Sequence, residues 1–418
     1  MIKKLSVLRG CCLCFCLLVS TAQGAEEAVN IGLLDKFFET EKLTQSDAVL
    51  VVDEQDNIIY QWRPDESMVP ASLLKLVTAY LAIKKWGLEH TFYTDFYRVD
   101  DQLWIKGYGD PYLVSEELDR LASQLTLLDV SWVNSIHIDS SYFVNEKAPG
   151  RSQVDDPYNA PLSAVAANFN TVMLQKVNGS IKSAESQTPL TPLVVELARS
   201  VKGWSTKPKR INLVNGVNAQ RNTGQILRAK LGRTSSPILV EQVLPEGALL
   251  FHRYQNSHAV DDIIRGMLKY SNNFMANQLF LSLADDLEKE NALTKRVSFS
   301  SASDYAQQSL SDAFSWQEHQ IVEGSGLSRE NRLTALQVND LLKALEPNKQ
   351  LFKKVKHSRA DIRAKTGTLD GVRSYAGYVD FPKKSYRFVF NFSRQVPWQY
   401  REKLLIRLVT QLHKSGAK

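Results

Sequence analysis

Two side chains that could act as a nucleophile and its base lie three residues apart. Ser72 and Lys75 stand at the start of an apolar run that follows Pro70 and ends at Trp86-Gly87. The run predicts a buried helix, and the i, i+3 spacing places both side chains on one face of it. A serine hydroxyl attacks once a base takes its proton, and a lysine with a lowered pKa can be that base. Alone, the pair is more typical of a capping serine and a lysine that reaches solvent.

Two further motifs support the chemical interpretation. Ser271 and Asn273 lie between two segments of helical periodicity, 259–270 and 273–285, and offer a hydroxyl and an amide. Lys365-Thr366-Gly367-Thr368 lies on a predicted strand, 360–368. Ser-x-x-Lys, Ser-Asp-Asn and Lys-Thr-Gly are the signature of penicillin-binding proteins and class A β-lactamases. All three occur here in this order, with Asn272 in place of the aspartate.

With these motifs in place, the chain resembles the D-alanyl-D-alanine carboxypeptidase/endopeptidase family, the class C low-molecular-mass penicillin-binding proteins. The 199 residues between Ser72 and Ser271 fit the large insert of that family, whereas class A β-lactamases have a much shorter spacing. Further segments match as well: Gly107–Leu113, Ile138–Phe143, Lys147–Gly150, Tyr158–Pro161, Gly324–Arg329 and Ala376–Tyr378. Glu323 departs from the pattern, because an aspartate is expected before the Gly-Ser-Gly loop.

The resemblance implies catalytic roles for four residues. Ser72 would be the acylated nucleophile and Lys75 its proton acceptor. Ser271 and Asn273 would relay protons and hold the substrate's amide. No metal and no organic cofactor is implied.

The resemblance also implies a substrate site along the Lys-Thr-Gly strand. Lys365 and Thr366 would bind the terminal carboxylate, and Gly367 would leave room for substrate. The backbone N–H groups of Ser72 and Thr368 would form the oxyanion hole.

Asp155 and Asp156 are candidates for a second contact. Related enzymes place an acidic residue in this region to bind the free amine of the stem peptide's diamino acid. A carboxylate can give such an amine a charge-assisted hydrogen bond. An almost equally good interpretation is that both are surface turn residues before Pro157. Of the two, Asp155 is the first choice for the amine contact.

The implied activity is that of a serine-type D-Ala-D-Ala carboxypeptidase/endopeptidase. It would remove the terminal D-Ala from peptidoglycan stem peptides or cut their cross-links, and it would bind penicillin and other β-lactams covalently. One alternative is a β-lactamase, against which the long insert argues. Another is a non-catalytic wall-binding protein, against which the intact motifs argue.

The expected fold is α+β, with a β-lactamase/DD-peptidase-like domain interrupted by a large mixed α/β insert. The domain would comprise an antiparallel sheet flanked by helices, built from residues 25–95 and 251–418. Residues 96–250 would form the insert.

Composition and charge narrow the protein class. The 418 residues are 44% apolar and 23% charged, which is typical of globular proteins. All four cysteines lie within residues 11–16, so thiol chemistry is excluded elsewhere. Residues 1–24 carry three bases, an apolar run and Ala22-Gln-Gly24, the layout of a secretory signal peptide, with an uncleaved membrane anchor as the alternative. We therefore expect an exported, periplasmic protein that begins near Ala25.

One segment is strongly basic although the mature chain is nearly balanced. Beyond residue 24, 48 bases stand against 45 acids, which does not indicate nucleic-acid binding. Residues 197–240 hold no acid and nine bases between residues 199 and 233. This segment predicts either a solvated basic face or a contact with an anionic polymer or membrane surface.

Overall fold

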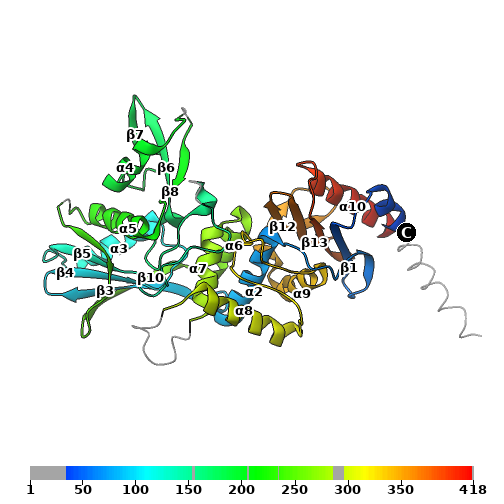
Figure 1. The fold of residues 1–418 in the computed structure, drawn as a ribbon, viewed down its shortest axis with the longest axis horizontal. Coiled ribbons are helices and arrows are strands. Elements are labelled where there is room, and N and C mark those ends of the chain that lie inside the picture. The colour runs from blue at the N-terminus through cyan, green and yellow to red at the C-terminus, as the bar shows by residue number, and fades with distance from the viewer. Residues whose placement is uncertain (1–33, 153–155, 205–206, 234, 286–295, 417–418) are drawn as a thin grey trace, which may run out of the picture.

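The computed structural model describes residues 34–152, 156–204, 207–233, 235–285 and 296–416. The molecule is elongated, with a six-stranded sheet at one end and a five-stranded sheet at the other (Figure 1). A third, three-stranded sheet projects from one side of the five-stranded part. The predicted signal peptide and Asp155 lie outside the described residues. No helix within the described ranges has the length and hydrophobicity to cross a bilayer.

The six-stranded sheet combines the two ends of the chain. Its order is β11-β12-β13-β14-β1-β2, and every neighbouring pair is antiparallel. The strands are β1 (Asp47–Asp53), β2 (Ile58–Trp62), β11 (Lys353–Val355), β12 (Asp361–Leu369), β13 (Val372–Asp380) and β14 (Ser385–Phe392). Strand β1 pairs directly with β14, so residues more than 330 positions apart in the chain lie side by side.

Helices cover both faces of this sheet. Along β1, Val49 and Val51 pack toward α10, while Leu50 and Val52 pack into the larger core on the opposite face. This is the period-2 alternation of a strand buried on both sides. Helix α10 (Tyr400–Gly416) covers one face and α9 (Ala335–Leu345) lies on the other. The larger core on the α9 side also contains α2 (Lys75–Trp86), α6 (Val260–Tyr270), α7 (Asn273–Leu283) and α8 (Phe299–Phe314).

The insert contains a mixed sheet. Its order is β10-β3-β4-β5-β9, antiparallel from β10 to β4 and parallel from β4 to β9. The strands are β3 (Thr91–Val99), β4 (Gln102–Gly107), β5 (Ser135–Asp139), β9 (Ile238–Gln242) and β10 (Leu249–Ala259), and helices α3 (Ser115–Leu127) and α5 (Gly216–Lys230) pack with them. Strand β10 leads directly into α6 and so links the insert to the part of the molecule that holds the six-stranded sheet.

The projecting sheet has its own small core. It has the order β7-β6-β8 and comprises β6 (Thr171–Val177), β7 (Ser180–Ser183) and β8 (Lys209–Asn212), with α4 (Pro192–Ser200) beside it. Val172 and Leu174 of β6 face α4 and α5 within this core. The opposite face of β6 and β8 therefore carries Thr171 and Arg210 toward the rest of the molecule.

The expected α+β architecture is confirmed. The buried helix after Pro70 and the Lys-Thr-Gly strand, both predicted from the sequence, form as α2 and β12. Short 3-10 helices are also present: η1 (Ala71–Leu74), η2 (Pro157–Asn159), η3 (Asn168–Asn170) and η4 (Glu346–Leu351). The sequence analysis did not identify β3, β10 or the projecting sheet. Strand β3 begins at Thr91, before the predicted start of the insert at residue 96.

Candidate active site

Ser72 and Lys75 lie at the entry to helix α2. Ser72 belongs to η1, and Lys75 is the first residue of the α-helix that follows. The preceding Ala71 has φ +49°, a conformation uncommon for a residue with a Cβ. Lys75 Nζ donates to Ser72 Oγ at 3.1 Å, so the i, i+3 geometry predicted from the sequence is present.

The Lys75 amine is held by two further acceptors. Its Nζ donates to Asn273 Oδ1 at 2.7 Å and to the backbone carbonyl of Ser325 at 2.6 Å. All three acceptors are neutral. Because Lys75 is fully buried, desolvation lowers its pKa to about 7, against the smaller, opposing effect of the Glu323 carboxylate. A substantial fraction of the Lys75 side chains is therefore neutral near pH 7 and able to accept a proton.

Ser271 and Asn273 are positioned by the junction of α6 and α7. Ser271 ends α6 in the left-handed conformation, with φ 53°. Asn272 caps α7 by accepting from the Met275 N–H at 3.1 Å, which explains its place between the two motif residues. Asn273 Nδ2 donates to the Tyr158 carbonyl at 3.1 Å, while its oxygen faces Lys75.

Strand β12 brings a second buried amine to the site. Lys365 Nζ donates to Ser271 Oγ at 2.8 Å and to the Thr366 carbonyl at 2.6 Å. The pKa of Lys365 lies well below its usual range, mainly because of burial and also because of the nearby Lys75 charge. An approaching carboxylate would favour the charged form of this lysine.

Gly367 lets β12 lie directly against η1. A Cβ at this position would lie 2.1 Å from Ser374 Oγ and 3.0 Å from the Ser72 nitrogen. Ser374 Oγ in turn donates to the Pro70 carbonyl at 2.8 Å. The close approach requires glycine and sets the distance between the strand and the serine turn.

The Gly324-Ser-Gly loop is organised by Glu323. Its fully buried carboxylate accepts from Ser325 N at 2.8 Å, Gly326 N at 2.7 Å and Asn331 Nδ2 at 2.8 Å. A Cβ on Gly326 would lie 1.8 Å from the Ala71 carbonyl oxygen. The loop therefore packs directly against the turn that carries Ser72. The longer Glu323 side chain, in place of the expected aspartate, fits this role.

These elements enclose a pocket of about 430 Å³ around Ser72. Ser271, Asn273 and Thr368 line it, as their motifs predict. Lys75 and Lys365 lie buried behind these residues. Tyr158, Gly326 and Leu327, which belong to segments that carry the family resemblance, line the pocket too. The sequence analysis missed the remaining lining residues, Leu369, Asp370 and Arg373.

Of the two predicted amine-binding aspartates, only Asp156 is among the described residues, and it does not line the pocket. Asp155 lies outside the described residues, and Asp156 Oδ2 accepts from the Tyr158 hydroxyl at 2.8 Å. The carboxylate that lines the pocket is Asp370, in the turn between β12 and β13. The sequence feature that could have identified Asp370 is its position two residues after Thr368, at the end of the Lys-Thr-Gly strand.

Comparison with known proteins identifies the family. The model described as the D-Ala-D-Ala carboxypeptidase 3 (S13) family matches residues 32–232 and 204–358. The chain belongs to this family. A D-alanyl-D-alanine carboxypeptidase of Actinomadura sp. (strain R39) is 24% identical, over 86% of this chain and 80% of the relative. The protein is accordingly a peptidase, as predicted.

Solved structures share the fold. Penicillin-binding protein 4 from Haemophilus influenzae matches with a TM-score of 0.68 and 20% identity, over 88% of this chain and 98% of the other. A predatory peptidoglycan endopeptidase from Bdellovibrio bacteriovorus matches with a TM-score of 0.51 and 13% identity, over 88% and 92% of the two chains. These structures confirm the DD-peptidase-like architecture.

The Glu323 carboxylate is testable through its effect on Lys75. Glu323→Gln removes the negative charge that raises the pKa of Lys75, so this pKa should fall further below about 7. The variant should also unfold at lower temperature, because each buried donor left unpaired costs about 1–3 kcal/mol. NMR titration of isotope-labelled lysine and thermal unfolding measure the two effects. Glu323→Asp keeps the charge and serves as the control; an unchanged Lys75 titration in Glu323→Gln would contradict the assignment.

Proposed function

We propose that the protein is a serine-type D-alanyl-D-alanine carboxypeptidase/endopeptidase acting on peptidoglycan stem peptides through an acyl-enzyme on Ser72. The observation that carries the proposal is the buried Lys75 amine, which contacts both Ser72 Oγ and Asn273 Oδ1. A lysine with a pKa of about 7 can act as general base at neutral pH.

In the acylation step, Ser72 Oγ attacks the carbonyl carbon between two D-amino acids and transfers its proton to Lys75. The N–H groups of Ser72 and Thr368 stabilise the oxyanion. Collapse of the intermediate breaks the amide bond, and the leaving amine takes a proton relayed by Lys75 and Ser271. Water then hydrolyses the ester and regenerates Ser72.

Lys365, Thr366 and Ser271 form the proposed site for the terminal carboxylate. Lys365 belongs to β12, the strand whose Gly367 lies against Ser72, and its amine contacts Ser271 Oγ. An arriving carboxylate would stabilise the ammonium form of Lys365 and receive charge-assisted hydrogen bonds. The leaving residue of the substrate would therefore lie on the Lys365 side of Ser72.

The proposal includes an exported, periplasmic location, in keeping with the signal-like residues 1–24. It also includes the basic segment between residues 199 and 233 as a contact for an anionic polymer or membrane surface. Several bases of this segment have partners within the protein: Arg210 pairs with Glu185, Lys230 with Asp119, and Arg228 donates to the Ser236 carbonyl. Arg199, Lys202 and Arg221 are the candidates for an external contact.

The nucleophile is tested with penicillin. A β-lactam should acylate Ser72 and leave a stable ester, which intact-protein mass spectrometry detects as added mass. Ser72→Ala should show no added mass. A wild-type protein that hydrolyses penicillin with rapid turnover and no accumulated ester would favour the β-lactamase alternative. A labelled Ser72→Ala would place the nucleophile elsewhere.

The base is tested by pH dependence. Because only neutral Lys75 accepts the serine proton, the acylation rate should rise with pH through about 7 and level off above it. Lys75→Arg should slow acylation by about a hundredfold or more, since arginine stays protonated. Stopped-flow acylation by a chromogenic β-lactam measures both effects. A rate in Lys75→Arg close to that of the wild type would rule out this role.

The amine contact is tested by comparing three aspartates. Asp370 lines the pocket on the side away from Lys365, so Asp370→Asn should lower kcat/KM about tenfold for stem peptides with a free side-chain amine. Penicillin acylation, which lacks this amine, should barely change. Asp155→Asn and Asp156→Asn are the matched variants; a selective loss in one of these, with Asp370→Asn unaffected, would move the contact to the originally predicted position.

A further inference from the structure

A second, larger groove opens beside the Ser72 pocket. It has a volume of about 900 Å³ and shares Tyr158, Ser271 and Asn273 with that pocket. Its walls come from α3, from the outward face of β6 and β8, and from the turn between α6 and α7. The groove is therefore formed jointly by the insert, the projecting sheet and the peptidase part.

The contacts along β12 show which part of a substrate would reach this groove. Asp370, after the end of β12, lines the Ser72 pocket. Gly367 lies against the Ser72 nitrogen, and Lys365 contacts Ser271, where the groove begins. With the scissile bond at Ser72, the acyl segment lies toward Asp370 and the leaving segment toward Lys365. This orientation rests on the proposed function, in which Lys365 binds the carboxylate of the leaving residue.

Aromatic side chains form an apolar surface in the groove. Tyr112 packs edge-on against Phe169 at 5.6 Å between ring centroids, and Phe169 packs against Phe274 at 6.2 Å. Tyr112 also lies 4.3 Å from the His258 ring. Such a surface suits the aliphatic arm of a diamino acid rather than a single methyl group.

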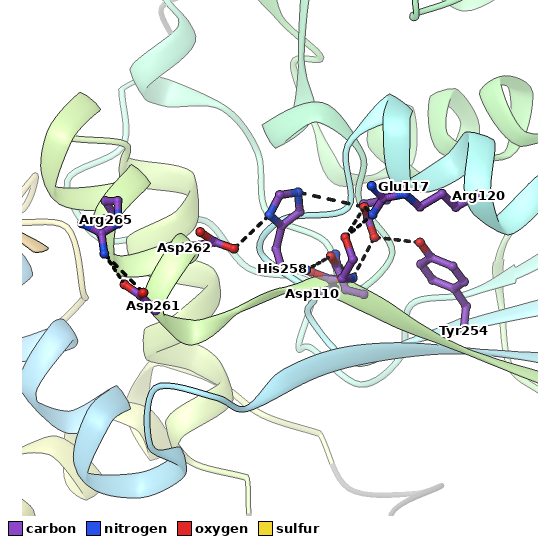
Figure 2. A network of polar contacts seen from close by, with 10 residues as sticks. Asp110, Glu117, Arg120, Tyr254, His258, Asp261, Asp262 and Arg265 are labelled. Carbon is purple, nitrogen blue, oxygen red and sulfur yellow. Dashed lines mark hydrogen bonds and ion pairs between the residues drawn. The ribbon is translucent and has the colours of Figure 1, made fainter.

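Two arginines line the same groove, each paired with a carboxylate. Figure 2 shows Arg120 against Glu117, at 2.7 Å, with His258 between Glu117 and Asp262. The Glu117 carboxylate is itself buried and accepts from the Tyr254 hydroxyl at 2.7 Å, while the Arg120 side chain remains 58% exposed.

Arg210 is oriented in the same way from the projecting sheet. It pairs with Glu185 at 2.5 Å and donates to Thr171 Oγ1 at 3.0 Å. A guanidinium has five N–H donors, so both arginines keep donors for peptide carbonyls or carboxylates. Their carboxylate partners reduce the entropy lost when a ligand is bound.

We propose that this groove binds the leaving strand of a cross-linked substrate: a peptide that carries a diamino acid arm and free carboxylates. When the leaving group is a single D-Ala, it ends at the Lys365 site and does not reach the groove. When the amide nitrogen belongs to a diamino acid, the rest of the second stem peptide continues past Ser271 into it. Cross-link cleavage therefore depends on the groove, and D-Ala release does not.

The test compares two purified substrates, a cross-linked peptide dimer and an uncross-linked pentapeptide. The double variant Arg120→Ala/Arg210→Ala should lower kcat/KM for the dimer about tenfold and leave D-Ala release within twofold of wild type. Glu116→Trp, which changes an exposed groove residue in the first turn of α3, should obstruct the dimer in the same selective way. Lys403→Ala removes one exposed charge from α10, outside both pockets, and should change neither activity.

Penicillin acylation separates the outcomes. Failure of the wild-type protein to form the ester would reject the proposed function itself. Two results with normal acylation would overturn the groove proposal. One is an equal loss of kcat/KM for dimer and pentapeptide, and the other is an unchanged kcat/KM for the dimer in both groove variants. Normal penicillin acylation by the arginine double variant shows that its active site is folded. If the double variant acylates poorly, the groove proposal is tested with Glu116→Trp instead.

Discussion

The burial of the Lys75 amine is the constraint on which the candidate site depends. A lysine removed from water loses the hydration of its charged form, and here its hydrogen-bond acceptors are neutral oxygens from Ser72, Asn273 and Ser325. The protonated and neutral forms are therefore close in free energy near pH 7. This balance makes the lysine suitable as a base, and it holds only while the surrounding segments exclude water.

Water is excluded by segments that are distant in the sequence. Asn273 lies 198 residues from Lys75 and Ser325 lies 250 residues from it, yet both contact the same nitrogen atom. Glycines permit this convergence, since side chains at Gly326 or Gly367 would collide with the turn that carries Ser72. The proposed chemistry thus needs the interrupted fold, because segments from both parts of the chain close around one amine.

Local patterns explain why much of the fold could be predicted from the sequence. The apolar run within Asp47–Asp53 and the longer apolar run after Pro70 each reflect burial of a single element. Strands β3 and β10 were missed because Arg253 and Asp95, which form an ion pair at 2.7 Å, interrupt any apolar pattern and lie 158 residues apart. Their pairing is a long-range property that a local window does not contain.

The same distinction applies within the site. The spacing of Ser72 and Lys75 is a local, helical relation, so sequence reasoning placed them correctly beside each other. The composition of the pocket wall depends on which loops face Ser72, and this is not a local property of the sequence. The sequence analysis therefore expected a carboxylate near Tyr158, whereas the structure has Asp370 lining the pocket. In the proposed function, substrate selection is thus distributed over loops and over the insert, whereas bond cleavage is assigned to the three motifs. Evolution of this arrangement can alter the pocket and the groove independently of Lys75, because neither the exposed Arg120 nor Asp370 takes part in burying the amine.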